Sequence, residues 1–372
     1  MKTTIRKILC SAAFLTVGIG FSSCTAYLDR SEDSIVSADL FYKNFYNFQG
    51  FTEELYYCIP PMNCAYWQSD YNWGEDELIV AGSTWFMGYK IDNGDFWGWQ
   101  KENDGWGACW MDGTGTTTNT SRMEKRMWPL MWYGIRKANI GLQHLNDMKD
   151  CTTEEYNLIA GQLYFFRGWF HFMLMQYFGG LPYIDHVLSS SSTSVQLPRL
   201  SYQECADKVA EDLKRAALLL PTDWDDTTPG QNTIGKNRQR INKIMALGLL
   251  GKNYLWAGSP LMNYESTGEK TYNQEYCKKA AETFAEMLSC CREEGGKGNY
   301  SLVDFSEYSS IFYTLNQGYK IPGGTEAIFM PPVYEAWGTY WSQSNQYTPG
   351  VLLDGASNMF CPTANYVNYY GM

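Results

Sequence analysis

Apolar residues recur at three- and four-residue steps in five stretches of the chain, the spacing of one face of an α-helix. The first stretch begins at Ala38 and ends before Pro60, which cannot continue a helix. The other four follow one another between Met127 and Gly295. Their apolar stripes are Trp128, Met131, Ile135, Ala138, Leu142 and Leu145; Ile159, Leu163, Phe166, Phe170, Met173 and Tyr177; Ala206, Val209, Leu213, Ala216 and Leu220; Ile244, Leu247, Leu250 and Tyr254, from about Arg240; and Ala280, Phe284 and Leu288, from Gln274.

Capping residues mark the ends of two of these helices. Thr152 with Glu155, and Ser201 with Glu204, have the spacing of a capping box, and Gly179 follows the end of the second stripe. Paired helices with small residues at their crossings predict a mostly α fold: a tetratricopeptide-like helical repeat array, without a strict 34-residue period. Within it, we expect Phe165, Phe166, Trp169, Phe170 and Phe172 to form core, and His171 to be a core residue rather than a ligand.

Two long segments interrupt the helical pattern. Residues 64–126 contain aromatic and acidic residues without periodicity, and residues 295–372 become irregular and aromatic again. We therefore expect long aromatic-rich loop insertions around a first helix at 38–63 and a tetratricopeptide-like region at 127–294.

The N-terminus has the pattern of a lipoprotein leader. A basic start precedes an apolar run from Ile8 to Phe21, too short to span a bilayer, and small residues lead to Cys24. This pattern predicts a signal peptide at 1–23, lipidation of Cys24, and a lipidated tether at 24–37. The alternative is an ordinary secretory leader in which Cys24 occurs by chance.

Charge and motif content exclude several classes of function. A formal net charge of -11 argues against nucleic-acid partners, which require clustered Lys and Arg. The 11 Cys include no CxxC pair, and the three His occur in no metal-ligand spacing, so neither a zinc ribbon nor a zinc protease is indicated. No nucleotide-binding or serine-hydrolase motif is present. We expect no cofactor, although the acidic loop leaves calcium possible.

Tryptophan is concentrated in the first aromatic segment. Seven of the 14 Trp fall between residues 67 and 110, among Asp and Glu residues. Indole rings can cover the apolar face of a pyranose while carboxylates accept from its hydroxyl groups. Alternatively, the Trp side chains pin a long loop to the helices. The candidate glycan-binding residues are Trp85, Trp97, Trp99 and Trp106, with Trp337 and Trp341 from the second segment.

The order of motifs along the helical part resembles a known family. Trp128 to Tyr133, then Gln162 to Arg167 leading to Tyr177–Pro182, resemble consecutive motifs of the SusD/RagB family of outer-membrane nutrient-binding lipoproteins. Later helices match in order, and residues 365–372 resemble a segment that introduces a further C-terminal stretch in the family, so this chain is expected to lack that part. Gln162 and Gly168 stand where the family more often has Glu and Ala.

The resemblance implies a function at the cell surface. It implies a lipid-anchored, outer-membrane glycan-binding protein without catalytic activity, which delivers oligosaccharides to a SusC-like TonB-dependent transporter. Two alternatives remain at this point: a surface glycoside hydrolase that uses loop carboxylates, and a helical-repeat scaffold for peptides or proteins.

Overall fold

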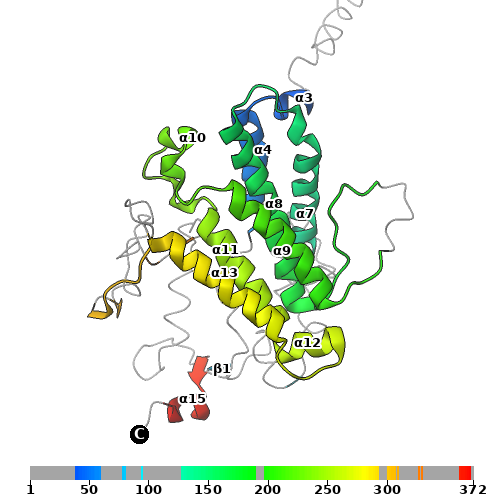
Figure 1. The fold of residues 1–372 in the computed structure, drawn as a ribbon, viewed down its shortest axis with the longest axis vertical. Coiled ribbons are helices and arrows are strands. Elements are labelled where there is room, and N and C mark those ends of the chain that lie inside the picture. The colour runs from blue at the N-terminus through cyan, green and yellow to red at the C-terminus, as the bar shows by residue number, and fades with distance from the viewer. Residues whose placement is uncertain are drawn as a thin grey trace, which may run out of the picture.

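The computed structural model describes residues 38–59, 78–80, 94, 127–189, 197–292, 300–306, 308–309, 326, 328–329 and 360–369. These residues form mostly helices (Figure 1). Labels follow Figure 1. The longer helices are α4 (Phe45–Tyr57), α7 (Met127–His144), α8 (Thr153–Phe178), α9 (Tyr202–Leu219), α11 (Lys243–Ala257), α12 (Pro260–Thr267) and α13 (Gln274–Arg292).

Short elements connect and flank these helices. They are the helices α3 (Ala38–Phe41), α10 (Thr228–Gln231) and α15 (Ala364–Asn368), the 3-10 turns η3 (Leu145–Asp147), η5 (Trp224–Asp226) and η6 (Asn237–Gln239), and the strands β1 (Leu78–Val80) and β2 (Phe360–Pro362). None of the helices in the described ranges is both long enough and apolar enough to cross a membrane.

Successive helices pack side by side, as expected for a tetratricopeptide-like array. Helix α8 contacts α7 on one side and α9 on the other, and α11 lies between α9 and α13. Helix α4 covers α7 and α8. The mostly α prediction is therefore confirmed, with α8 as the central helix of the packing.

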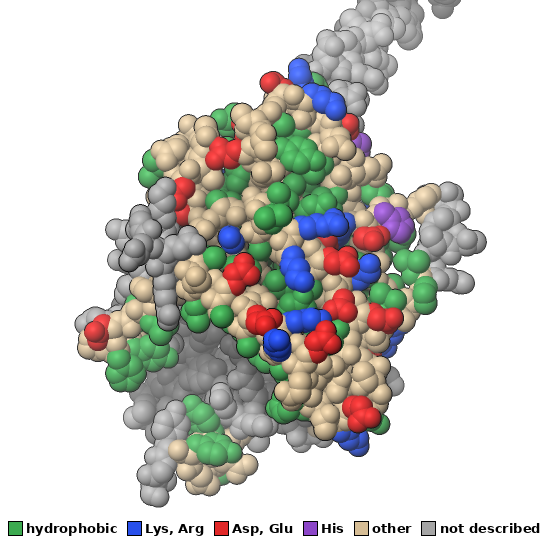
Figure 2. Space-filling model, viewed as in Figure 1, with side chains coloured by type: hydrophobic (Ala, Val, Ile, Leu, Met, Phe, Trp, Pro, Cys, Tyr) green, Lys and Arg blue, Asp and Glu red, His purple; other side chains and the backbone are tan. Residues whose placement is uncertain are grey.

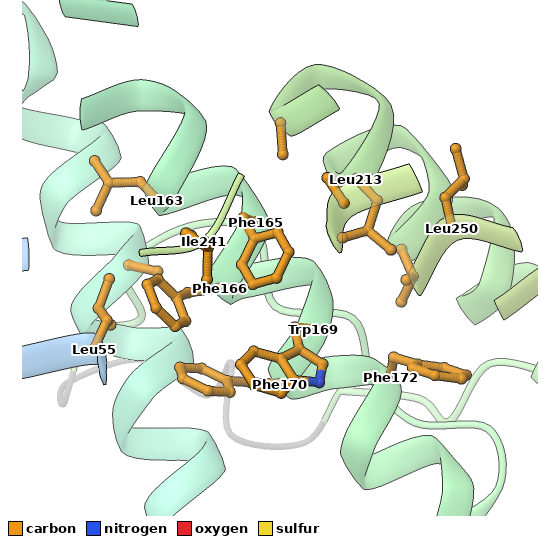
Figure 3. Close-up of a cluster of buried hydrophobic side chains, with 14 of the residues drawn as sticks. Leu55, Leu163, Phe165, Phe166, Trp169, Phe170, Phe172, Leu213, Ile241 and Leu250 are labelled. Atoms are coloured by element: carbon orange, nitrogen blue, oxygen red, sulfur yellow. The ribbon is translucent and has the colours of Figure 1, made fainter. Parts of the chain in front are cut away.

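The core is built around the aromatic face of α8 (Figure 3). Phe165, Phe166 and Phe170 are fully buried, and Trp169 and Phe172 nearly so, as the sequence predicts. Leu55 from α4 and Leu213 from α9 approach this cluster from opposite sides. One aromatic helix thus joins several layers of the array.

Both predicted capping boxes are present. The side chain of Thr152 accepts from the backbone N–H of Glu155, and Ser201 accepts from that of Glu204, while each glutamate accepts from the cap backbone. Helix α8 ends at Gly179, whose φ of 73° is a conformation that favours glycine. The termini of α8 and the start of α9 are therefore set by local sequence.

The first helical stretch differs from the single helix expected at 38–63. It forms α3 and then α4, because Asn44 adopts an extended conformation, pairs with Asp150 in an isolated bridge, and caps α4 through its side chain. At the other edge of the array, Leu288 belongs to the predicted stripe of α13 but is 46% exposed. Among the described elements, α13 packs mainly against α11, and Tyr276 also donates a hydrogen bond to Asp207 of α9.

The face formed by α9 and α13 carries both signs of charge (Figure 2). Lys279 pairs with Glu275 at 2.7 Å, and Lys208 with Glu211 at 3.8 Å. Interleaved charges of this kind solvate a surface and do not form the basic stripe that a phosphate backbone requires.

Candidate functional site

The six candidate sugar-stacking residues all lie outside the described residues, as does Cys24. Trp85, Trp97, Trp99 and Trp106 belong to the segment between α4 and α7; Trp337 and Trp341 belong to the segment before β2. The structure describes where these two aromatic segments meet each other and where they join the helical array.

A strand pair joins the two segments. Strand β1, from the first segment, runs antiparallel to β2, from the end of the second, with Leu78 opposite Pro362, Ile79 opposite Cys361 and Val80 opposite Phe360. Trp85 follows Val80 by only a few residues in sequence. The strand pair therefore holds together two regions that are far apart in the chain, residues 78–80 and 360–362. Three-residue strands at such separation leave no pattern by which sequence reasoning could have found them.

The first segment enters α7 at an aromatic cluster. Trp128, in the first turn of α7, meets Phe178 at the end of α8 edge to face, with ring centroids 4.7 Å apart, and Trp132 at 5.4 Å. Trp132 in turn packs edge-on against the ring of His171 at 5.8 Å. Edge-to-face packing adds a directional attraction between the rings to the burial of apolar surface. It therefore fixes the start of α7, where the first aromatic segment ends, against the end of α8.

The second segment is docked on α8. The ring of Phe329 meets Trp169 nearly perpendicularly, at 86° and 6.2 Å between centroids, and Ile328 also packs against the core. Upstream, the carboxylate of Glu326 accepts a 3.0 Å bond from the backbone N–H of Val303. The second segment is therefore anchored to the same helix whose C-terminal end receives the first.

A buried ion pair connects α8 to α9. The guanidinium of Arg167 donates two bonds of 2.6 Å to the carboxylate of Asp212, and both side chains are almost inaccessible. Arg167 also donates to the side-chain oxygen of Asn139 on α7, at 2.9 Å. Burial alone lowers the pKa of Arg167, but the bonds and charge of Asp212 outweigh it and raise the pKa. One side chain therefore ties three helices together.

The same network fixes the segment after α8. Arg167 donates to the carbonyl of Asp185, and Asn139 donates to the carbonyls of Ile184 and His186. The hydroxyl of Tyr183 donates to Asp212 at 2.6 Å. Burial, reinforced by the charge of Asp212, raises the pKa of Tyr183 well above its usual value, so this hydroxyl keeps its proton.

His171 is the core residue that the sequence predicts. Its Nδ1 lies 2.8 Å from the carbonyl oxygen of Arg167, and its Nε2 lies 3.1 Å from the backbone N–H of Ile184. Because a carbonyl only accepts and an N–H only donates, Nδ1 carries the proton and Nε2 is the acceptor. Burial lowers the pKa of His171 to about 3, which keeps the ring neutral. Both nitrogens are thus occupied in holding backbone atoms.

A second buried polar cluster, which sequence reasoning missed, connects α4 to α8. The amides of Gln49 and Gln162 bond each other, with Gln162 donating to Gln49 at 2.8 Å, and the hydroxyl of Tyr56 donates to Gln162 at 2.9 Å. Arg240 extends the cluster by pairing with Glu53 at 2.8 Å. The partners are more than 100 residues apart in sequence, so no local signal marks them. Gln162, where the family more often has Glu, is thereby a neutral residue in a satisfied network.

The described side chains offer no group of three His, Cys, Asp or Glu residues arranged to hold a metal ion. Their buried polar groups serve instead to fix helices and backbone segments that carry the two aromatic segments.

Comparison with known sequences finds similarity to SusD-like proteins. Residues 97–255 match the family model of SusD-like proteins described as "Starch-binding associating with outer membrane". A SusD-like protein P2 of Formosa agariphila is 27% identical over 119 residues, which are 32% of this chain and 23% of that protein.

Solved structures share the fold. A SusD-like protein from Bacteroides fragilis is 20% identical with a TM-score of 0.51, and the match covers 79% of this chain and 46% of that one. A Bacteroides vulgatus protein proposed to bind sugar is 16% identical with a TM-score of 0.55, covering 88% and 62%. The chain thus spans less than two thirds of each of these relatives. Over residues 97–255 the chain is thus similar to SusD-like proteins, and it shares the helical fold of the solved structures.

Proposed function

We propose that this chain is a glycan-binding protein of the outer membrane and that it binds without cleaving its ligand. The observation that carries the proposal is the β1–β2 pair, which joins the two aromatic segments of the chain. The family model adds support, since its description names starch binding at the outer membrane.

The chemistry of the two segments suits a sugar polymer. Trp85, Trp97, Trp99 and Trp106 supply flat apolar rings in the first segment, and Trp337 and Trp341 supply them in the second. Rings from two joined segments can contact successive sugar units, and neighbouring carboxylates accept from the hydroxyl groups. The ligand is therefore an oligosaccharide or polysaccharide, held by stacking and by hydrogen bonds that its hydroxyl groups donate.

The proposal includes a lipid anchor at Cys24 and delivery of the bound glycan to a SusC-like TonB-dependent transporter. Two acyl chains hold a protein stably on a membrane where one chain is marginal. Replacing Cys24 with Ala should move the protein from the membrane fraction to the soluble fraction. Tight membrane association of Cys24→Ala would contradict the anchor.

A panel of polysaccharides tests the binding function. Electrophoretic mobility in gels that contain each polysaccharide reports binding, and chromatography of the incubated polysaccharide reports released sugars. Retardation without released product supports the proposal. Released sugars would instead indicate a glycoside hydrolase, and an absence of both across the panel would favour a scaffold for peptides or proteins.

A further inference from the structure

Two aromatic rings stack on each other at the surface, in the part of the second aromatic segment that follows α13. Phe305 is 88% exposed and Tyr308 is 46% exposed. Their rings are nearly parallel, at 14°, with 6.0 Å between the centroids. Figure 1 shows this part of the chain, in orange, projecting from the helical array beyond the end of α13. Single exposed apolar side chains are common on proteins, so the informative feature is the parallel arrangement of two rings.

Hydrogen bonds attach the chain before the rings to the rest of the protein. The side-chain amide of Asn242, which caps α11, donates to the hydroxyl of Tyr300 at 2.6 Å. The backbone N–H of Val303 donates to the carboxylate of Glu326 at 3.0 Å. The rings are therefore presented by a backbone that is already ordered, and a ligand that binds them pays less entropy for ordering it.

A hydrogen-bond acceptor lies directly before Phe305. The Oδ1 atom of Asp304 accepts from the backbone N–H of Ser306 at 3.0 Å and from its hydroxyl at 2.8 Å. These two bonds lower the pKa of Asp304, so the exposed carboxylate is ionised at neutral pH and only accepts. No donor in the described ranges is bonded to its other oxygen, Oδ2.

This combination of groups fits a sugar chain better than it fits a protein surface. Two parallel rings can each meet the apolar face of one of two adjacent pyranose units, and sugar hydroxyl groups can donate to the carboxylate. A protein that covered the rings would also bury the charge of Asp304 beside them, which is unfavourable unless a partner is supplied.

We propose that Phe305 and Tyr308 form a sugar-stacking surface, on which they contact adjacent units of the bound glycan while Asp304 accepts from a hydroxyl group. This inference rests on glycan binding in the proposed function. It adds a described contact in the second aromatic segment to the six Trp residues, and it assigns the ligand a length of at least two sugar units.

Replacement of the rings in the full chain tests this surface. Calorimetric titration measures affinity for the polysaccharide that retards the parent protein in gels. Phe305→Ala and Tyr308→Ala should each weaken binding by at least about fivefold, the lower end of the effect of aromatic stacking on a flat ligand. Phe305→Tyr keeps a flat ring and should bind like the parent, whereas Phe305→Leu keeps apolar bulk without a flat face and should bind like Phe305→Ala.

Tyr272→Ala is the matched control. Tyr272 is 60% exposed and lies between α12 and α13, so its loss should leave affinity unchanged. Thermal melts of all variants accompany the titrations, and the melting temperatures should equal that of the parent because the rings are exposed.

The outcomes separate this surface from the proposed function. A parent protein that binds no polysaccharide of the panel overturns both. A parent that binds, with Phe305→Ala and Tyr308→Ala binding equally well, overturns the surface alone. Normal binding by Phe305→Leu, or a loss of affinity that always accompanies a lowered melting temperature, would also overturn it, since the rings would then act by bulk or by stabilising the fold.

Discussion

The guanidinium of Arg167 and the carboxylate of Asp212 form two parallel hydrogen bonds of 2.6 Å between α8 and α9, in a place that water barely reaches. A buried pair of this kind does not guarantee a large net gain, because both ions lose their hydration. Its main effect appears when one partner is removed. The other charge is then left in the core without compensation.

Arg167→Met should therefore destabilise the protein by about 3–5 kcal/mol, since it leaves Asp212 buried and unpaired. Urea unfolding measures this loss. The double variant Arg167→Met/Asp212→Leu should recover much of it, although Tyr183 still loses its acceptor. Lys208→Ala, which breaks an exposed pair, is the control and should change stability by less than about 0.5 kcal/mol. A double variant as unstable as the single one would contradict this account.

The stability of the fold should fall as the pH falls below about 6.5. The pKa of His171 is about 3 in the folded state and ordinary in the unfolded state, so between these values the unfolded chain binds one more proton. The stabilising effect is complete above the unfolded pKa and is lost towards pH 3, at roughly 1.4 kcal/mol per pH unit.

Most carboxyl groups titrate below pH 5, so unfolding measured between pH 7 and pH 5 reports mainly the effect of His171. His171→Leu should be less stable at pH 7 but should show a flatter pH dependence in this range. Equal slopes in the parent and the variant would show that His171 is not the group responsible.

The register of the β1–β2 pair can be tested by a single cysteine. Ile79 lies opposite Cys361, and residues opposite each other in an antiparallel pair have Cβ atoms about 4.5–5.5 Å apart. Ile79→Cys should form a disulfide with Cys361 under mild oxidation, detected by peptide mapping. Val80→Cys is the matched control, because the residue opposite Val80 in this register is Phe360 and not Cys361. Equal crosslinking of both variants to Cys361 would argue against this register.

The six candidate Trp residues form the proposed stacking platform. If their rings stack on the sugar, replacing them should lower the affinity for the glycan and leave the stability of the fold largely unchanged. Alanine at Trp85, Trp97, Trp99 or Trp106 should weaken binding of the polysaccharide found in the panel by about 1–3 kcal/mol if that ring is engaged, or roughly five- to 150-fold. Trp337→Ala and Trp341→Ala should have smaller effects. Calorimetric titration and thermal melts of the same variants separate the two quantities.

Trp224→Ala provides the structural comparison for that series. Trp224 is buried, and its indole N–H donates to the carbonyl of Ile241 at 2.7 Å. Its loss should lower the melting temperature while the folded fraction binds normally. If all six aromatic variants behave like Trp224→Ala, the two segments are anchored loops and the platform lies elsewhere.

Local features of this fold could be read from the sequence. The stripe that contains Phe166 and Phe170, and the capping box of Thr152 and Glu155, depend on residues three or four positions apart, and the structure confirms both. The core role of His171 followed from its place on an apolar helix face. Such features repeat within one helix, so a single segment contains the whole signal.

Contacts between distant segments could not be read in this way. The pairing of Ile79 with Cys361, the amide pair of Gln49 and Gln162, and the packing of Phe329 on Trp169 depend on how the whole chain is folded. The break between α3 and α4 has the same origin, because Asn44 is held by Asp150 from beyond α7. The contribution of the Trp residues themselves stays a prediction.

The segment that follows α8, residues 184–188, is held through bonds to its backbone atoms. Arg167, Asn139 and His171 hold the carbonyls of Asp185, Ile184 and His186 and the N–H of Ile184, and Arg136 holds the carbonyl of Leu188. All of these bonds end on main-chain atoms, which every residue except proline provides in full. The side chains at positions 185–188 should therefore tolerate variation, whereas Ile184 also packs against the core and its N–H bond to His171 excludes proline there. This stretch is a place where new recognition sequences could be grafted without redesigning the scaffold beneath.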